Sequence, residues 1–213
     1  NNMNRELLVD YLPFEITREQ INESMKENNG RLVVRGVLQR AEAKNQNGRV
    51  YPKEVLMREA KKYTESFIKE QRALGELDHP EDLKVNLDRV SHMITEMWMD
   101  GANGFGKLKI LPTPMGKLVE TMLGAGVKLG VSSRGSGNVN ESNGNVSDFE
   151  IVTVDVVAQP SAPGAYPTAI YEGLLNMNGG HKMLEMATDA RESLTAQRYL
   201  EKGLKSLIKD LKI

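Results

Sequence analysis

The feature that most restricts the fold is a pair of strand-like segments joined by a five-residue turn. The segments are "VSHMITEMWM" (90–99) and "FGKLKIL" (105–111), and "DGANG" lies between them. Asp-Gly and Asn-Gly pairs are typical of the tight turns that connect neighbouring antiparallel strands. The middle of the chain is therefore predicted to contain an antiparallel hairpin.

Further strands and helices are predicted on both sides of this hairpin. "RLVVRGVLQRA" (31–41) and "FEIVTVDVVA" (149–158) are rich in aliphatic and β-branched residues, which favours buried strands. Apolar residues recur at helical spacing over 53–72, and "MGKLVETMLGAG" (115–126) predicts a short helix that glycine ends. Because strands dominate and do not alternate regularly with helices, we expect an α+β or barrel-like domain rather than a doubly wound sheet.

Changes in local composition and residue pattern divide the chain into three parts. Residues 1–30 are expected to be an N-terminal extension, and residues 31–172 contain the predicted strands and helices of the main domain. Residues 173–213 begin with the linker-like "GLLNMNGGHK" and continue as a charged segment with leucines at helical spacing. This predicted C-terminal amphipathic helix either packs on its own domain or docks on a neighbouring subunit or another protein.

Composition excludes several classes of function. The chain has 213 residues and a formal net charge of -1, which gives no reason to expect nucleic acid or an anionic membrane as a partner. It has no cysteine, so disulfides and thiolate metal sites are excluded. No apolar run approaches the ~20 residues that span a bilayer, and the N-terminal segment lacks a signal-peptide pattern. We expect a soluble intracellular protein without a cofactor.

The chain has three histidines that are candidates for a catalytic role. His79 lies in "ALGELDHPED", where it is either a general base beside carboxylates or a solvated loop residue. His92 falls in an apolar strand and is expected to be packed, and little around His181 suggests a role. Glu76 and Asp78 beside His79 resemble a metal site, but no second histidine follows at the required spacing, so no metal is expected.

The serines of "GVSSRG" (130–135) are candidate nucleophiles that need a base, and His79 is the best one available. Adjacent side chains on a strand point to opposite faces, so only one of Ser132 and Ser133 can face His79. Asp155 lies in an otherwise apolar strand, where an unpaired carboxylate is costly. It is expected either to orient His79 or to pair with an arginine such as Arg134.

Four stretches, in this order and at these intervals, carry a resemblance to a known family: "NGRVYPKEVL", "RALGELDHP", "GVSSRG" and "VAQPSAP". Together they resemble the prohead core protein proteases of T-even and related tailed phages. The resemblance covers roughly residues 31–172 and implies a serine protease domain similar in fold to the herpesvirus assemblins. Such a domain has a β-barrel-like core of mostly antiparallel strands with surrounding helices.

The resemblance also implies roles for individual residues. His79 matches the family's catalytic histidine and Ser132 its nucleophile. Asp155 falls at the acid position of the related phage enzymes. The third member in herpesvirus enzymes is a second histidine, which this chain lacks between positions 92 and 181, so either Asp155 fills the role or a dyad operates.

The remaining residues of the serine motif are assigned to oxyanion and substrate binding. Arg134 resembles the family arginine that helps to form the oxyanion site, and backbone N–H groups from Ser133 to Gly135 are expected to add donors. Gly130 is expected to let the strand turn tightly, and Gly135 to open the chain into a polar loop.

The implied function is a maturation protease that cuts scaffold or core proteins and capsid proteins inside the phage prohead, in the cytoplasm of the host cell. A homo-oligomer is expected. The alternatives are a non-enzymatic scaffold or core protein with a protease-like fold, and a metal-dependent hydrolase built around Glu76 and His79.

The resemblance further implies cleavage after glutamate when leucine or isoleucine stands two residues earlier. Five stretches fit: "INE" (21–23), "LGE" (74–76), "ITE" (94–96), "LVE" (118–120) and "IYE" (170–172). We predict self-processing between Glu172 and Gly173, because exposed linkers are where proteolytic nicking concentrates. "INE" is the second choice.

Overall fold

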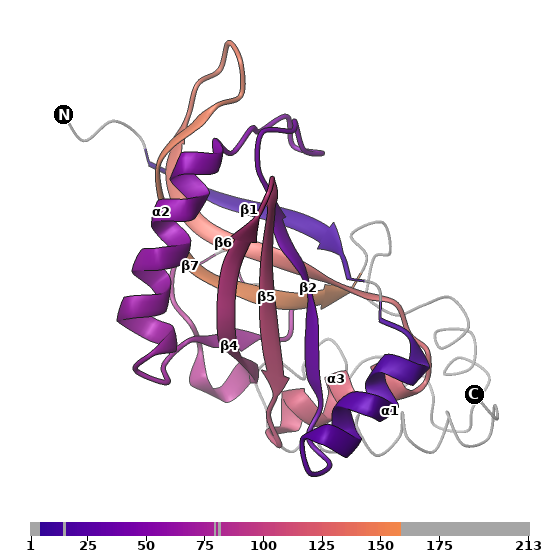
Figure 1. Ribbon diagram of the computed structural model, residues 1–213. Helices are drawn as coiled ribbons and strands as arrows, with labels where there is room; N and C mark the ends of the chain where they lie inside the picture. The colour runs from indigo at the N-terminus through magenta and orange to yellow at the C-terminus, as the bar shows by residue number, and fades with distance from the viewer. Residues whose placement is uncertain (1–4, 15, 79, 81, 159–213) are drawn as a thin grey trace, which may run out of the picture.

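The computed structural model describes residues 5–14, 16–78, 80 and 82–158, which form two antiparallel sheets and three α-helices (Figure 1). The first sheet has the order β1-β6-β7, and the second has the order β2-β5-β4-β3. The strands of the two sheets cross one another in Figure 1. The strands are β1 (Glu6–Pro13), β2 (Val33–Arg40), β3 (Leu74–Glu76), β4 (Val90–Asp100), β5 (Asn103–Ile110), β6 (Leu129–Val139) and β7 (Val146–Ala158).

Local sequence signals explain where the helices begin. Helix α1 (Arg18–Glu27) starts at Thr17, whose hydroxyl accepts from the backbone N–H of Gln20, while the Gln20 side chain accepts from the backbone N–H of Thr17. Helix α3 (Pro114–Gly124) starts with proline after the capping residue Thr113. Helix α2 (Lys53–Tyr63) continues as a π-helical turn, Thr64–Ile68, and a 3-10 turn, Leu87–Arg89, precedes β4.

The predicted hairpin is confirmed as β4 and β5, which pair in antiparallel register down to Asp100 and Asn103. Gly101 in its turn has φ of 58°, a left-handed conformation that favours glycine. The predicted strands over 31–41 and 149–158 are found as β2 and β7, and both predicted helices are present. The expectation of an α+β domain with mostly antiparallel strands is confirmed.

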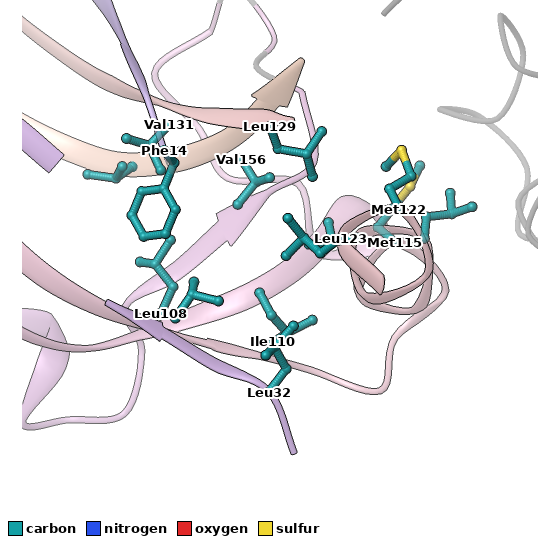
Figure 2. Packing of buried hydrophobic residues seen from close by; sticks show 14 of the residues in the cluster. Phe14, Leu32, Leu108, Ile110, Met115, Met122, Leu123, Leu129, Val131 and Val156 are labelled. Atoms are coloured by element: carbon teal, nitrogen blue, oxygen red, sulfur yellow. The ribbon is translucent and has the colours of Figure 1, made fainter. Parts of the chain in front are cut away.

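The main hydrophobic core lies between the two sheets and is closed at one end by α1 and α3 (Figures 1 and 2). Alternate residues of β2, β4, β5, β6 and β7 point into it, as the period of two in a strand requires. Members of this core labelled in Figure 2 include Phe14, Leu32, Leu108, Ile110, Met115, Met122, Leu123, Leu129, Val131 and Val156. Leu129 and Val131 of β6 and Val154 and Val156 of β7 anchor these two strands in the core.

The short strand β3 connects the two sheets. It pairs with β4 on one edge, and beyond its end Leu77 forms a parallel bridge with Val156 of β7. The fully buried His92 of β4 reaches across Gly75 to the carbonyl of Val154, with Nε2 at 2.7 Å from that oxygen. His92 is thus the packed strand residue that was predicted. Closure of the sheets into a barrel remains a prediction.

The serine motif lies within a continuous strand, which corrects the expectation that Gly130 lets the strand turn tightly and that Gly135 opens the chain into a polar loop. Strand β6 runs through "GVSSRG" to Val139, and neither Gly130 nor Gly135 has a positive φ. These glycines leave space for neighbours instead: a Cβ on Gly130 would lie 2.1 Å from the Tyr11 ring, and one on Gly135 would lie 2.7 Å from the Phe149 ring. The polar loop beyond the motif is reduced to a short turn between β6 and β7.

Residues expected as an extension contribute to the sheet that carries the serine motif. Strand β1 pairs with β6 over the whole motif, with Tyr11 opposite Ser132 and Asp10 opposite Ser133. Residues 159–213, which include the predicted linker and C-terminal helix, lie outside the described residues. Within the described part of the chain, we find no helix long and apolar enough to cross a membrane.

Candidate functional site

Strand β6 sends the two serines of the motif to opposite faces of its sheet. Ser133 points toward the second sheet, where its Oγ accepts a hydrogen bond from Nε2 of Gln39 at 2.8 Å. Ser132 points the other way, is fully buried, and its Oγ has no hydrogen-bond partner among the described residues. A buried hydroxyl left unpaired costs about 1–3 kcal/mol, so this arrangement needs an explanation other than stability.

Ser133 lines a small apolar cavity between α2 and the two sheets. Its walls include Leu38, Leu56, Met97 and Phe149. This cavity is on the inner face of the sheet, away from Ser132. The two serines therefore lie on opposite faces of the sheet, as the alternation of side chains along a strand requires.

Asp155 lies directly opposite Ser132 in the register of β6 and β7, and it is fully buried. Its Oδ2 accepts from Nε of Arg134 at 3.0 Å, and its Oδ1 accepts from Nη2 of Arg134 and from the backbone N–H of Glu76. Burial raises the pKa of Asp155 from 3.8 to about 6, and the Arg134 guanidinium opposes this rise. Of the alternatives for Asp155, the pairing with Arg134 is present, and the orientation of His79 by Asp155 stays a prediction.

Glu76 is a buried acid whose role the sequence did not reveal. Its Oε2 accepts from Nη2 of Arg134 at 2.7 Å, and its Oε1 accepts from Nδ2 of Asn86 and lies 3.5 Å from Nε of Arg89. Strand β3 brings it there because β3 runs beside β7. The available signal was its position at the end of "LGE", where a carboxylate in a short buried strand needs a partner.

His79 lies outside the described residues, but its neighbours are placed. The backbone N–H of Asp78 donates to the carbonyl of Val156 at 2.7 Å. Val156 follows Asp155, the residue opposite Ser132. Residues 77 and 78 therefore lie along the edge of β7, the strand that pairs with β6 at Ser132.

The other assigned residues have varied placements. Arg134 and Gly135 lie in the middle of β6, and the pairing register with β7 shifts between them. Glu172 and Gly173 lie outside the described residues. The second-choice cleavage stretch, 21–23, lies inside α1, so it is helical rather than extended. No group of acidic or histidine side chains in the described ranges could hold a metal ion.

The chain is similar to known phage proteins. The sequence model of a family described as prohead core protein serine protease matches residues 9–173. The prohead core protein protease of Enterobacteria phage T4 is 34% identical over 145 residues, which are 64% of this chain and 68% of that protein. A solved structure of the bacteriophage T4 capsid assembly protease has a TM-score of 0.63 and 26% identity, and the match covers 73% of this chain and 99% of that one.

Proposed function

This chain belongs to the family of prohead core protein serine proteases, and from this premise we propose that it is a phage prohead maturation protease. Its substrates are scaffold or core proteins and capsid proteins, which it cleaves by serine acyl transfer inside the assembling head, within the host cell. The names of the T4 relatives, a prohead core protein protease and a capsid assembly protease, support this substrate class and location.

Ser132 is the proposed nucleophile, and the state of its hydroxyl is the observation that carries the proposal. The side chain is buried, and its Oγ keeps no bond to any described residue. Ser133, the neighbouring candidate, is committed to Gln39 on the opposite face. Among the described residues the hydroxyl at position 132 therefore has no partner, at a place where a serine kept only for stability would have found one.

His79 is the proposed base. It takes the proton of Ser132 as Oγ attacks the scissile carbonyl carbon, and gives that proton to the amine that leaves. Water then attacks the acyl-enzyme in the same way and releases the second product. The bond between Asp78 and Val156 supports this role, because it ties the residue before His79 to the strand that faces Ser132.

Asp155 is the proposed acid of the site. Among the described residues its Oδ2 accepts one bond, from Arg134, so a lone pair is left for an imidazole N–H. For the oxyanion we propose backbone N–H groups between Ser133 and Gly135, supported by the shift of register between Arg134 and Gly135.

The bridge between Leu77 and Val156 supports a barrel-like core. Assembly as a homo-oligomer remains part of the proposal.

The test compares cleavage of the phage's own scaffold proteins by wild-type protein, Ser132→Ala and Ser133→Ala. We expect cleavage by wild type and measurable cleavage by Ser133→Ala, because that change only releases Gln39. Ser132→Ala should be inactive. Equal cleavage by Ser132→Ala and wild type contradicts the assignment of the nucleophile. Absence of cleavage by all three proteins supports the alternative of a non-enzymatic scaffold protein.

A further inference from the structure

Arg134 uses its whole hydrogen-bonding capacity inside the protein. A guanidinium has five N–H donors. Nε donates to Asp155, Nη2 donates to Asp155 and Glu76, and Nη1 donates to the carbonyls of Asp82 at 2.8 Å and Lys84 at 2.5 Å. Arg134 is fully buried. Its side chain therefore has no donor to spare for an oxyanion unless one of these bonds breaks.

The charges around Arg134 are balanced, which keeps the guanidinium in one place. Two carboxylates, those of Asp155 and Glu76, contact it, and Arg89 lies 3.5 Å from the far oxygen of Glu76. Buried ion pairs are weak evidence for a gain in stability, because the cost of desolvation offsets most of the attraction. A fully satisfied fork with fixed geometry is better suited to holding other groups in a defined position.

The groups held by Nη1 belong to the segment between β3 and the 3-10 turn, which carries His79. None of the described residues from 77 to 88 is buried, and the side chains of Leu83 and Leu87 are 50% and 76% exposed. Leu77 packs against the main core at the start of the segment, but hydrophobic packing does little to hold the rest of it. Among the described residues its polar anchors are the Asp78 bond to β7 before His79, and the two Arg134 bonds and the Asn86 bond to Glu76 after it.

We propose that Arg134 is a positioning residue that clamps the 77–88 segment against β6. Arg134 stands two residues after Ser132 on the same face of the strand, so one strand carries both the nucleophile and the clamp. Its guanidinium fixes the carbonyls of Asp82 and Lys84, which sets where His79 lies relative to Ser132. The link to catalysis rests on the proposed function, whereas the clamp itself does not.

The test substitutes Arg134→Lys, which keeps the positive charge but replaces the five-donor fork with a compact ammonium. Arg49→Lys is the matched control, because Arg49 bonds Asp10 and the carbonyl of Val9 and supports a different loop, residues 42–50. Hydrogen exchange followed by mass spectrometry reports both loops in each protein. We expect Arg134→Lys to exchange faster over 77–88 with little change over 42–50, and Arg49→Lys to show the reverse.

A second readout is the rate at which a serine-reactive phosphonate labels Ser132. A base displaced by about 1 Å can lower reactivity ~100-fold, so we expect a fall of that order in Arg134→Lys and little change in Arg49→Lys. Slower labelling with wild-type exchange over 77–88 would instead make Arg134 an oxyanion donor and overturn the clamp. Equal loosening of every segment would also overturn it, because Arg134 would then act only on overall stability.

Two further controls cover a variant that does not fold and a failure of the proposed function. If Arg134→Lys does not fold, the charge-balanced double variant R134Q/D155N, which leaves Glu76 beside Arg89, must show the same selective loosening over 77–88. If Ser132→Ala cleaves as well as wild type, the proposed function fails. The exchange experiment still decides the clamp in that case, since it does not depend on activity.

Discussion

Acid should destabilise this protein through His92, which is fully buried between β3 and β7. The carbonyl of Val154 can only accept, so Nε2 of His92 carries a hydrogen. Near neutral pH the buried ring is neutral, so Nδ1 accepts from the hydroxyl of Ser91 at 2.8 Å. Burial lowers the pKa of His92 from 6.5 to about 4, while the bond to Val154 opposes this change.

The size of the effect follows from this shift. Above pH 6.5 the ring is neutral in both the folded and the unfolded state, so the full stability is present. Between pH 6.5 and about 4, His92 binds a proton in the unfolded chain but not in the folded protein. The free energy of unfolding therefore falls as the pH falls. At 1.36 kcal/mol for each unit of pKa, the loss by pH 4 is about 3 kcal/mol.

Asp155 acts in the opposite direction over nearly the same range. Burial raises its pKa from 3.8 to about 6, so the folded state binds a proton more tightly than the unfolded state, and stability rises as the pH falls through this window. The two contributions are of similar size and partly cancel. The pH dependence of wild-type protein alone therefore does not isolate His92.

The assay is urea unfolding of wild-type protein and His92→Gln from pH 7 to pH 4, with Gln chosen because its amide can still donate toward Val154. The free energy of unfolding of wild type minus that of the variant should fall by about 3 kcal/mol over this range. The absolute stability of the variant is not critical, because only the slope is compared. Parallel curves for the two proteins would show that the buried His92 does not resist protonation.

Three further predictions concern the site and its surroundings. Asp155→Asn should lower the free energy of unfolding by ~3 kcal/mol in chemical denaturation, because Arg134 loses a buried partner. It should also lower turnover by up to ~10⁴-fold under conditions where both proteins are folded. A fall in turnover below tenfold would exclude Asp155 as the acid that orients His79. Gly130→Ala should cost ~1–3 kcal/mol in thermal unfolding because its Cβ meets Tyr11 and the Leu12 carbonyl, whereas Gly124→Ala, with open space around it, should be tolerated. Glu172→Gln should abolish a fragment that ends at residue 172 in a mass spectrum of aged protein while cleavage of scaffold proteins continues; persistence of that fragment would contradict the assigned processing site.

Local patterns predicted most of the secondary structure. The turn between β4 and β5 depends on a few neighbouring residues, and so does the helical spacing of apolar residues in α2. Both could therefore be predicted from the sequence. A carboxylate in an apolar strand needs a partner, so the sequence left two roles for Asp155: orienting His79 or pairing with an arginine such as Arg134. In each case the physical requirement is local to one segment.

Long-range pairing accounts for what the sequence did not reveal. Strand β1 joins β6 across more than a hundred residues, and nothing within 6–13 specifies that partner. Glu76 contacts Arg134 only because β3 packs beside β7, a contact that depends on the whole sheet arrangement. The glycines of "GVSSRG" were interpreted as turn residues because the rings of Tyr11 and Phe149, which need the space, lie on other strands.

The most direct test of the central claim is covalent labelling of Ser132. Wild-type protein, Ser132→Ala and Ser133→Ala are each incubated with a serine-reactive phosphonate, digested and analysed by peptide mass spectrometry. We predict one phosphonate adduct on the peptide that contains residue 132 in wild type and in Ser133→Ala, and none in Ser132→Ala. An adduct on Ser133, or labelling of Ser132→Ala to the same extent as wild type, would contradict the claim that Ser132 is the nucleophile.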